Sequence, residues 1–368
     1  MSTRRVGILL PHTGVYPGLG GMLASELSKL GWLTTVRHRA DEDLLGYDLL
    51  LLAGQCRNID GLSQVLRKRR DKIPATILWQ LEPLPPAQLS QQGEEIGLRV
   101  AAWHWGRMPL MARRVLNCII PFRTRLMGLV HSGLARSYAR QVVKEPDHQG
   151  WQRYCLQNYS AAMGEWLWIR SAYVNGWLDH CFASNQMRVR FLRSRGIKAE
   201  MLPVGYHPSW GRDWQLKRDI DVLFLGDIGI GLRGAVLRAV REQLGQHGRT
   251  LTLARGVYGE KRDELLSRSR TMLSVLRVPH DMAGMRVLLG LACGTLVISD
   301  LCDDTGAFQP GEHFVMAASE RLPEVIEYYL THEEERQKIA RQGHRFVTEE
   351  LTLAKGMRRM LAHVATDI

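Results

Sequence analysis

The sequence lacks an apolar run long enough to cross a membrane, and its first apolar run, residues 6–11, is too short for the core of a signal peptide. Its six cysteines form no Cys-x-x-Cys pair, which argues against a zinc site and against a redox pair of thiols. Low-complexity tracts and short internal repeats are also absent from the sequence. We therefore expect a cytoplasmic protein whose cysteines are reduced.

Acidic residues are outnumbered by basic ones. The chain holds 49 Lys and Arg against 37 Asp and Glu, which gives a net charge of +12 and a pI near 9.7. This charge favours an anionic partner: a nucleotide, a nucleic acid or a lipid surface. The chain has 368 residues, 45% of them hydrophobic and 23% charged, and is therefore predicted to form two globular domains.

Strand and helix patterns alternate in two parts of the chain, up to about residue 80 and again from residue 179 onward. This alternation predicts the α/β class, with two Rossmann-like doubly wound domains that face each other across a cleft. Between the two parts, residues from about 104 to 175 show helical periodicity alone, which predicts a helical insert in the N-terminal domain. The expected divisions are an N-terminal domain over 1–202, a linker over 203–219, a C-terminal domain over 220–345, and C-terminal helices over 346–368 that cross back.

An apolar helix pattern and an apolar strand pattern follow each other late in the chain. Asp281 stands at the expected N-cap of a helix over 282–292, and Gly294 suits the position just after a helix. The strand pattern over 295–299 then ends at Asp300. These two elements are therefore predicted to form one helix-and-strand unit of a parallel sheet.

Four polar side chains lie around these two elements: His280, Asp281, Arg286 and Asp300. In doubly wound sheets, ligands bind at the carboxyl ends of strands and at the N-termini of helices. We therefore expect the four side chains to gather at one binding site. The alternative is that Asp281 only caps the helix, while His280 and Arg286 are surface side chains.

Three sequences in this half of the chain carry a family resemblance. They are RVLLGLACG at 286–294, PGEHFV at 310–315, and the helical stretch 322–347. In order and spacing they resemble the C-terminal half of group 1 glycosyltransferases with the GT-B fold, and the branch they resemble most is the CgeB-like type of spore-maturation protein. The resemblance covers about residues 180–350, and the N-terminal half matches only in kind.

The resemblance implies a glycosyltransferase that moves a sugar from a nucleoside diphosphate sugar to an unidentified acceptor. It implies that the donor binds the C-terminal domain and the acceptor the N-terminal domain, with no metal and no cofactor. Basic side chains and helix N-termini would take the charge of the leaving diphosphate. The residues expected at the donor are Gly226, Arg233, Arg255, His280, Asp281, Arg286 and Asp300.

One departure from the family pattern bears on activity. Many members carry two Glu separated by seven residues, and the second holds the nucleotide ribose, whereas this chain has Asp281 and Leu289 at these positions. Leu289 cannot accept a hydrogen bond from a ribose hydroxyl. Either another group does so, or the nucleotide is held differently, or catalysis has been lost. A non-catalytic GT-B-fold binding or assembly protein is therefore the alternative interpretation.

Two Asp-x-Asp sequences match the metal motif of the other glycosyltransferase fold. They are Asp41–Asp43 and Asp219–Asp221. The first is expected to cap a short turn, and the second precedes a strand pattern instead of following one. We therefore interpret both as structural, in agreement with a reaction that needs no metal.

On the acceptor side, the sequence offers a Gly-rich loop and two candidate bases. Gly18, Gly20 and Gly21 lack the spacing of a dinucleotide fingerprint, so a loop that faces an acceptor fits them better. His12 follows the first strand pattern, and Glu82 follows the fourth in a Pro-rich turn. Either could act as the catalytic base that takes a proton from the acceptor. The alternatives are a loop histidine and a surface acid.

The predicted insert is basic. Residues 106–144 hold eight Arg and Lys and no acid, with apolar residues at roughly helical spacing. Such a segment can make peripheral contact with an anionic membrane, here at its inner face, and the alternative is a packed helix with a solvated basic face. Nucleic acid is an unlikely partner, since the chain has no recognised binding motif and its aromatic residues are not interleaved with the charge.

Overall fold

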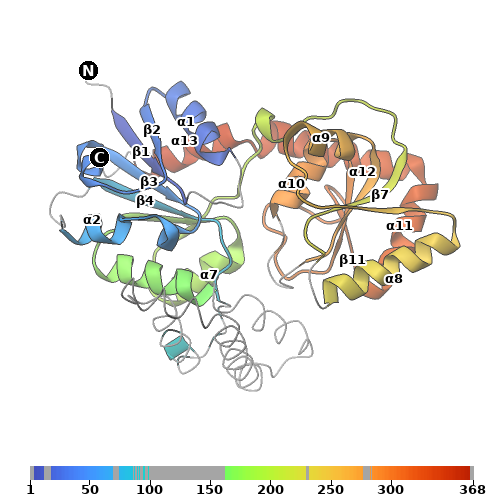
Figure 1. Cartoon of the computed structure of the whole chain (residues 1–368), viewed down its shortest axis with the longest axis horizontal. Coiled ribbons are helices and arrows are strands. Elements are labelled where there is room, and N and C mark those ends of the chain that lie inside the picture. The colour runs from blue at the N-terminus through green and yellow to red at the C-terminus, as the bar shows by residue number, and fades with distance from the viewer. Residues whose placement is uncertain are drawn as a thin grey trace, which may run out of the picture. The chain divides into compact units, whose positions relative to one another are not determined.

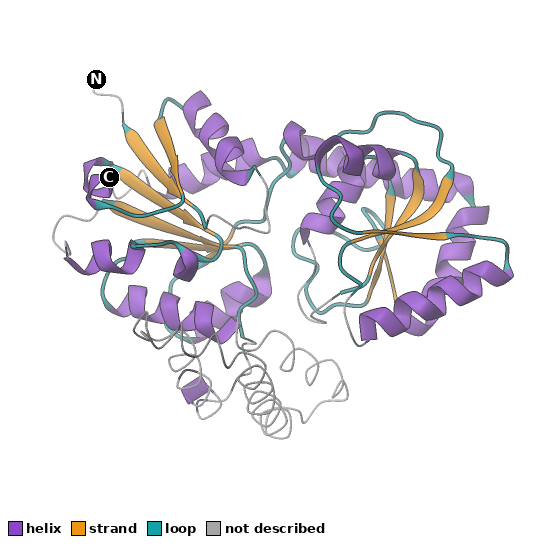
Figure 2. Ribbon diagram, in the orientation of Figure 1, coloured by secondary structure: helices purple, strands orange, loops and turns teal. Residues whose placement is uncertain are grey.

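The computed structural model describes residues 4–11, 18–68, 74–85, 87, 89, 91, 94–95, 98, 162–228, 232–276, 282 and 284–364. The chain divides into two compact units, Met1–Met201 and Leu202–Ile368 (Figure 1). Each unit is built on one parallel β-sheet covered by helices (Figure 2). The predicted α/β class with two Rossmann-like units is therefore confirmed. The basic segment 106–144, His12, His280 and Asp281 lie outside the described residues.

The first unit has a six-stranded sheet in the order β2-β1-β3-β4-β5-β6, and every pair is parallel. Figure 1 shows helix α1 (Leu19–Lys29) on one face of this sheet, with α2 (Leu62–Lys68) and α7 (Gln186–Ser194) on the other. Because both faces are covered, the central strands are continuously apolar. The strands are β1 (Arg5–Leu9), β2 (Leu33–Arg37), β3 (Leu49–Ala53), β4 (Ala75–Gln80), β5 (His180–Ala183) and β6 (Glu200–Met201).

The second unit repeats this winding with five parallel strands in the order β11-β10-β9-β7-β8. The strands are β7 (Ile220–Leu225), β8 (Leu251–Ala254), β9 (Ser269–Ser274), β10 (Leu296–Asp300) and β11 (Val315–Ala317). The helices are α8 (Leu232–Gln246), α9 (Gly259–Ser267), α10 (Gly284–Ala292), α11 (Leu322–Thr331), α12 (Glu333–Arg345) and α13 (Leu353–Val364). The last three form the helical end of the chain that the sequence predicts.

Alternate residues of β7 enter different cores. Val222 and Phe224 belong to the cluster that also contains residues of α8 and α11. Leu223, between them, belongs to a smaller cluster with Leu266 and Cys293. Side chains of a strand alternate between the two faces of a sheet, so burial on both faces requires an unbroken apolar sequence. The apolar sequence ends at Leu225, where β7 also ends. Gly226 and the residues after it therefore lie at the carboxyl end of the strand.

Helix α10 packs closely on the sheet. A Cβ atom on Gly290 would lie 2.6 Å from a methyl carbon of Val297, so no larger residue fits at this position without a shift. Gly294 follows the helix with a φ of 65°, as the sequence predicts. The expected start at residue 282 is wrong, because α10 begins at Gly284. Met282 is buried, and its carbonyl accepts the N–H of Gly284 in a tight turn before the helix.

The segment 203–219 packs on the second unit. Arg218 donates hydrogen bonds to the carbonyls of Ser269 and Cys293. Arg262 donates to the carbonyl of Trp210, whose side chain is buried. Among the described residues, no helix is long and apolar enough to span a membrane.

Candidate functional site

The carboxyl end of β7 meets Arg286, a predicted donor-side residue on α10. Gly226 follows β7 with a φ of 137°, which favours glycine, and its N–H donates to the carbonyl of Ala254. A Cβ atom on Gly226 would lie 3.1 Å from an Nη atom of Arg286. The Arg286 guanidinium therefore rests against the backbone at the end of β7, where a side chain on residue 226 would crowd it.

Two guanidiniums share one aromatic ring at this edge. The Cζ atom of Arg286 lies 5.2 Å from the centre of the Phe224 ring, and that of Arg233 lies 5.9 Å from it. Arg286 also donates to the carbonyl of Val275 at 3.2 Å, and Arg233 donates to the carbonyl of Asp227 at 3.2 Å. The ring face and the carbonyls attract the two cations and fix their positions. Two positive charges are thus held together, which suits an anionic ligand.

Asp300 supplies the nearby negative charge. It ends β10, is 9% exposed, and accepts the N–H of Leu276 at 2.9 Å. Burial raises the pKa of Asp300 to about 6, whereas the hydrogen bond from Leu276 and the charges of Arg233 and Arg286 lower it. The carboxyl therefore changes charge just below neutral pH, next to both arginines.

Arg255 lies at the rim of this group. It follows β8, its side chain is 76% exposed, and an Nη atom lies 3.7 Å from the Asp227 carboxylate. The structure thus brings together five predicted donor-side residues at the carboxyl ends of neighbouring strands: Gly226, Arg233, Arg255, Arg286 and Asp300. Their role in binding stays a prediction.

Leu289 occupies the position that the family resemblance assigns to a ribose-binding Glu. Its side chain is half-buried and packs on an apolar cluster that includes Leu223 and Leu266. Leu225 packs on the same cluster from the end of β7. This position therefore contributes an apolar contact.

Two of the three predicted acceptor-side glycines lie in a helix. Helix α1 begins at Leu19, so Gly20 and Gly21 are helical, and Gly18 precedes the helix with a φ of 78°. A Cβ on Gly20 would lie 2.7 Å from side-chain carbons of Leu10 and Val36. Gly20 thus allows α1 to pack on β1 and β2, and the expectation that all three glycines lie in a loop is wrong.

Glu82 follows β4 and is half-buried. Its backbone is fixed from two sides: the amide of Gln80 donates to the Glu82 carbonyl at 3.0 Å, and the guanidinium of Arg188 donates to the carbonyl of Leu81. Gln80 and Arg188 are both buried. This candidate base therefore stands on a rigid turn at the carboxyl edge of the first sheet.

Sequence reasoning missed a buried ion pair at the same edge. Arg57 lies in the turn after β3, and its Nε atom is 3.5 Å from a carboxyl oxygen of Glu165. The side chains are 11% and 2% exposed. Burial raises the pKa of Glu165 to about 8, although the charge of Arg57 lowers it. The signal in the sequence was a lone acid among apolar residues in the helical stretch 162–174.

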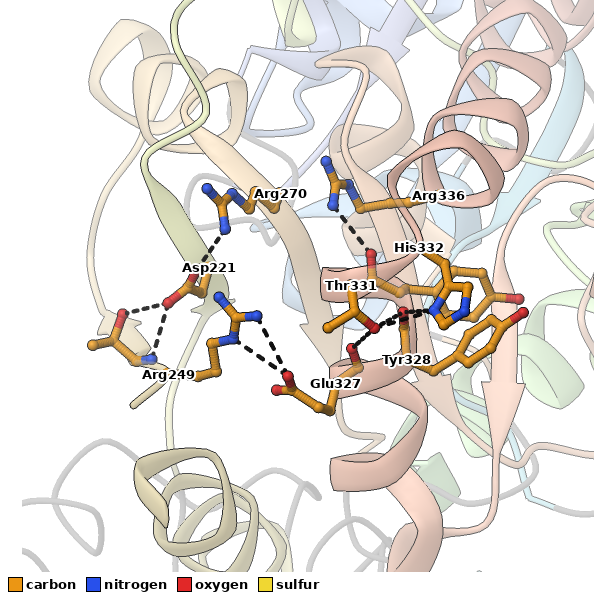
Figure 3. A network of polar contacts seen from close by, with 10 residues as sticks. Asp221, Arg249, Arg270, Glu327, Tyr328, Thr331, His332 and Arg336 are labelled. Atoms are coloured by element: carbon orange, nitrogen blue, oxygen red, sulfur yellow. Dashed lines mark hydrogen bonds and ion pairs between the residues drawn. The ribbon is translucent and has the colours of Figure 1, made fainter. Parts of the chain in front are cut away.

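A separate polar network lies near the amino ends of the second unit's strands (Figure 3). Arg270 lies 3.1 Å from the Asp221 carboxylate, and Arg249 lies 3.4 Å from that of Glu327 on α11. Asp219 is paired with Arg268 at 2.8 Å. Both carboxylates of the second Asp-x-Asp sequence are thus engaged in ion pairs.

A pocket of about 450 Å³ lies between α8 and α11, beside this network. His332, in its lining, stacks on the ring of Tyr328 with 3.9 Å between ring centres (Figure 3). Its lining contains none of the predicted site residues. The remaining lining residues are Gln243, Leu244, Gln246, His247, Pro323, Glu324, Glu327 and Thr331.

Comparison with known proteins agrees with this fold. Residues 233–362 match a family described as glycosyl transferase-like. No curated protein matches the chain by sequence. Sucrose-phosphate synthase from Thermosynechococcus elongatus is similar with a TM-score of 0.52 and 11% identity, over 99% of this chain and 100% of that chain. A glycosyltransferase from Rickettsia africae is similar with a TM-score of 0.50 and 11% identity, over 99% and 98% of the two chains.

At such low identity, the structural likeness establishes the fold alone, which is the two-unit α/β arrangement of GT-B proteins. The family match adds that residues 233–362 of the second unit are similar to a glycosyl transferase-like family. The resemblance to the CgeB-like branch stays a prediction.

Proposed function

We propose that the protein is a glycosyltransferase that transfers a sugar from a nucleoside diphosphate sugar to the hydroxyl of an acceptor, without a resident metal. The glycosyl transferase-like match over residues 233–362 and the GT-B fold support this proposal. The observation that carries it is the pair of guanidiniums of Arg233 and Arg286 on the ring of Phe224, beside Gly226.

In this proposal the two arginines bind the diphosphate of the donor. A guanidinium can give two parallel hydrogen bonds to phosphate oxygens, and its charge does not depend on pH. When the bond between the sugar and the diphosphate breaks, negative charge grows on the leaving phosphate oxygen. Cations that are already in position stabilise this charge without reorganisation, which lowers the barrier. Their charge is what would replace a metal ion.

Asp300 and Arg255 have supporting roles in this proposal. Asp300 keeps one carboxyl oxygen on the N–H of Leu276, and its charge helps hold the two arginines. It can also accept a hydrogen bond from a sugar hydroxyl. Arg255, at the exposed rim, would attract the anionic donor.

On the first unit, Glu82 is the proposed acceptor-side base. In an inverting transfer, its carboxylate would take the proton of the acceptor hydroxyl as the new glycosidic bond forms. Its rigid backbone, fixed through Gln80 and Arg188, supports this role because a base must be held in place. His12 stays the other candidate base from the sequence.

Leu289 favours a second candidate function, a GT-B-fold protein that binds a nucleotide without catalysis. Its side chain makes an apolar contact, whereas the family resemblance implies a carboxylate for the ribose at this position. Both functions predict nucleotide binding, but only the enzyme would break the bond between sugar and diphosphate. Assay of UDP-glucose and GDP-mannose cleavage, with and without simple sugars as acceptors, separates the two functions.

Calorimetric titration of UDP, GDP and ADP into the protein tests the site itself. We expect one of them to bind to the wild type and to lose affinity when Arg233 and Arg286 are both changed to Ala. Arg241→Ala is the matched control, because Arg241 is an exposed arginine further along α8. Absence of binding by all three nucleotides, or equal binding by the double variant, would overturn the proposal.

A further inference from the structure

The pocket between α8 and α11 lies where both helices end. Helix α8 ends at Gln246 and α11 ends at Thr331, and the last turns of both helices line the pocket. The last carbonyl groups of a helix have no partner within it, and they give this end of the helix a negative partial charge. Two such ends beside one pocket favour a cation over an anion.

The side chains that line the pocket add negative charge. Glu324 and Glu327 are among them, whereas none of the described lining residues is Lys or Arg. Arg321 lies 3.4 Å from the Glu324 carboxylate, but the two side chains are 71% and 73% exposed, so this pair attracts weakly. Because the whole chain has a net charge of +12, a pocket with acidic side chains differs from the chain as a whole.

Glu327 keeps part of its capacity to accept hydrogen bonds. The Nε and Nη2 atoms of Arg249 share one of its oxygens, Oε1, and both are 3.4 Å away, which is long for a hydrogen bond. The other oxygen, Oε2, is buried and accepts no hydrogen bond from the described part of the chain. A buried acceptor without a donor is costly. A ligand that donates to this carboxylate would therefore stabilise it.

Tyr328 provides a fixed aromatic side chain in the lining. Its ring stacks on that of His332, and its hydroxyl donates to the Glu335 carboxylate at 2.9 Å (Figure 3 shows the stack). Next to it, the hydroxyl of Thr331 donates to the carbonyl of Glu327 at 3.0 Å. Tyr328 is still 41% exposed. The face of a tyrosine ring attracts cations, so this wall agrees with the charge of the carboxylates.

We propose that this pocket binds a small organic cation that carries amine or guanidinium groups. Such groups donate several hydrogen bonds and accept none, which matches a lining rich in acceptors. The volume of about 450 Å³ is in the range of pockets that hold small molecules. A metal ion matches less well, because the described residues include no group of three His, Cys, Asp or Glu suited to hold one.

This site is separate from the arginine site of the proposed function. Arg233 lies in the first turn of α8, whereas the pocket is lined by the last turn of the same helix. A helix of 15 residues is about 22 Å long, so the two sites are well apart. Binding of the organic cation therefore does not depend on the nucleotide.

Calorimetric titration of two cations into the full chain tests the proposal. Spermidine represents a free amine, and N-acetyl-arginine amide represents the arginine side chain of a peptide. We expect at least one of them to bind at one saturable site, and the one that binds more tightly shows which source of the cation the pocket prefers. 1,4-Butanediol, which is uncharged, should not bind. The titrations are made at pH 8, because a protonated imidazole in the lining would repel a cation. Absence of saturable binding by both cations would overturn the proposal.

Two variants place this binding in the pocket. Glu327→Gln should weaken it about tenfold or more, the scale of a hydrogen bond to a charged group. Glu324→Gln should weaken it about threefold, the scale of an exposed ion pair. The Glu324 side chain is 73% exposed, so this variant should fold even if Glu327→Gln does not. Glu260→Gln is the matched control and should bind as the wild type does, because Glu260 is an exposed glutamate on α9 outside the lining.

Equal affinity of the wild type and Glu324→Gln, or an equal loss in Glu260→Gln, would overturn the proposal. The double change of Arg233 and Arg286 to Ala should leave the binding of the cation unchanged. Failure of nucleotide binding would therefore leave this site as it is, and failure of the cation to bind would leave the arginine site as it is.

Discussion

The guanidinium of Arg286 is held over the ring of Phe224, with 5.2 Å between its Cζ atom and the ring centre. It is held a second time by the carbonyl of Val275 and fills the space beside Gly226. The side chain is therefore in place before any anion arrives, and little conformational entropy is lost when it binds one. This relationship makes Arg286 the first residue to change.

Arg286→Ala should weaken the binding of the preferred nucleoside diphosphate by about 2 kcal/mol, the scale of a lost charge-assisted hydrogen bond. Arg286→Lys should also weaken it, because lysine keeps the charge but loses the two-pronged geometry. Isothermal titration calorimetry measures both, with Arg241→Ala as the control on α8. Equal affinity of all four proteins would mean that Arg286 does not contact the diphosphate.

Gly226→Ala should lower stability and nucleotide affinity together. Its φ of 137° is unfavourable for alanine, and the added Cβ would meet Arg286 at 3.1 Å. We expect a loss of about 1 kcal/mol or more in the free energy of unfolding. Gly245→Ala is the matched control, since Gly245 is helical with open space around it, and this change should stabilise the protein slightly. Urea unfolding compares them, and equal effects would contradict the prediction.

Asp300 should make stability depend on pH. Burial raises its pKa from 3.8 to about 6, so between these values the folded state holds a proton that the unfolded state releases. The stability of the wild type should therefore fall as pH rises through this interval. Asp300→Asn does not titrate, so the wild type should lose about 2 kcal/mol relative to the variant from pH 4 to pH 6. Urea unfolding at several pH values measures the difference, and parallel curves would contradict it.

The basic segment 106–144 carries a prediction from sequence alone. Its eight basic residues without an acid should bind anionic vesicles. Co-sedimentation with phosphatidylserine vesicles should exceed that with phosphatidylcholine vesicles, and it should decline as salt rises, because salt screens the attraction. Equal sedimentation with both vesicles would leave packing as the role of this segment.

The strands could be predicted because burial on both faces of a sheet requires a local run of apolar residues in the sequence. The run Leu49–Ala53 is wholly apolar because both faces of β3 are covered, and the fold class follows from the alternation of such runs with helices. The start of α10 was less predictable. Asp281 offers a good cap, but the buried Met282 forms a tight turn, and the helix begins two residues later than expected.

The donor-side group was predictable for a similar reason. Gly226 follows β7 and Asp300 ends β10, and both strands belong to one parallel sheet, so their nearness follows from the fold. The pair of Arg57 and Glu165 could not be predicted, because 108 positions separate the two residues. Local sequence patterns do not indicate which distant acidic and basic residues will pair in the folded chain. The prediction that Gly20 lies in a loop was wrong for another reason. A glycine that allows close packing cannot be distinguished from a glycine in a loop by sequence alone.

Leu289 allows a final prediction about the ribose. Its side chain cannot accept a hydrogen bond and packs on the apolar cluster that includes Leu223 and Leu266. If the nucleotide binds as family resemblance implies, the wild type should bind the preferred diphosphate and its 2′-deoxy form with similar affinity. Leu289→Glu should introduce a preference for the ribose form of about 1 kcal/mol, the net value of a hydrogen bond. Leu289→Gln is the control for side-chain size and polarity. Strong discrimination by the wild type would show that another group holds the ribose, and would remove the main argument for a non-catalytic protein.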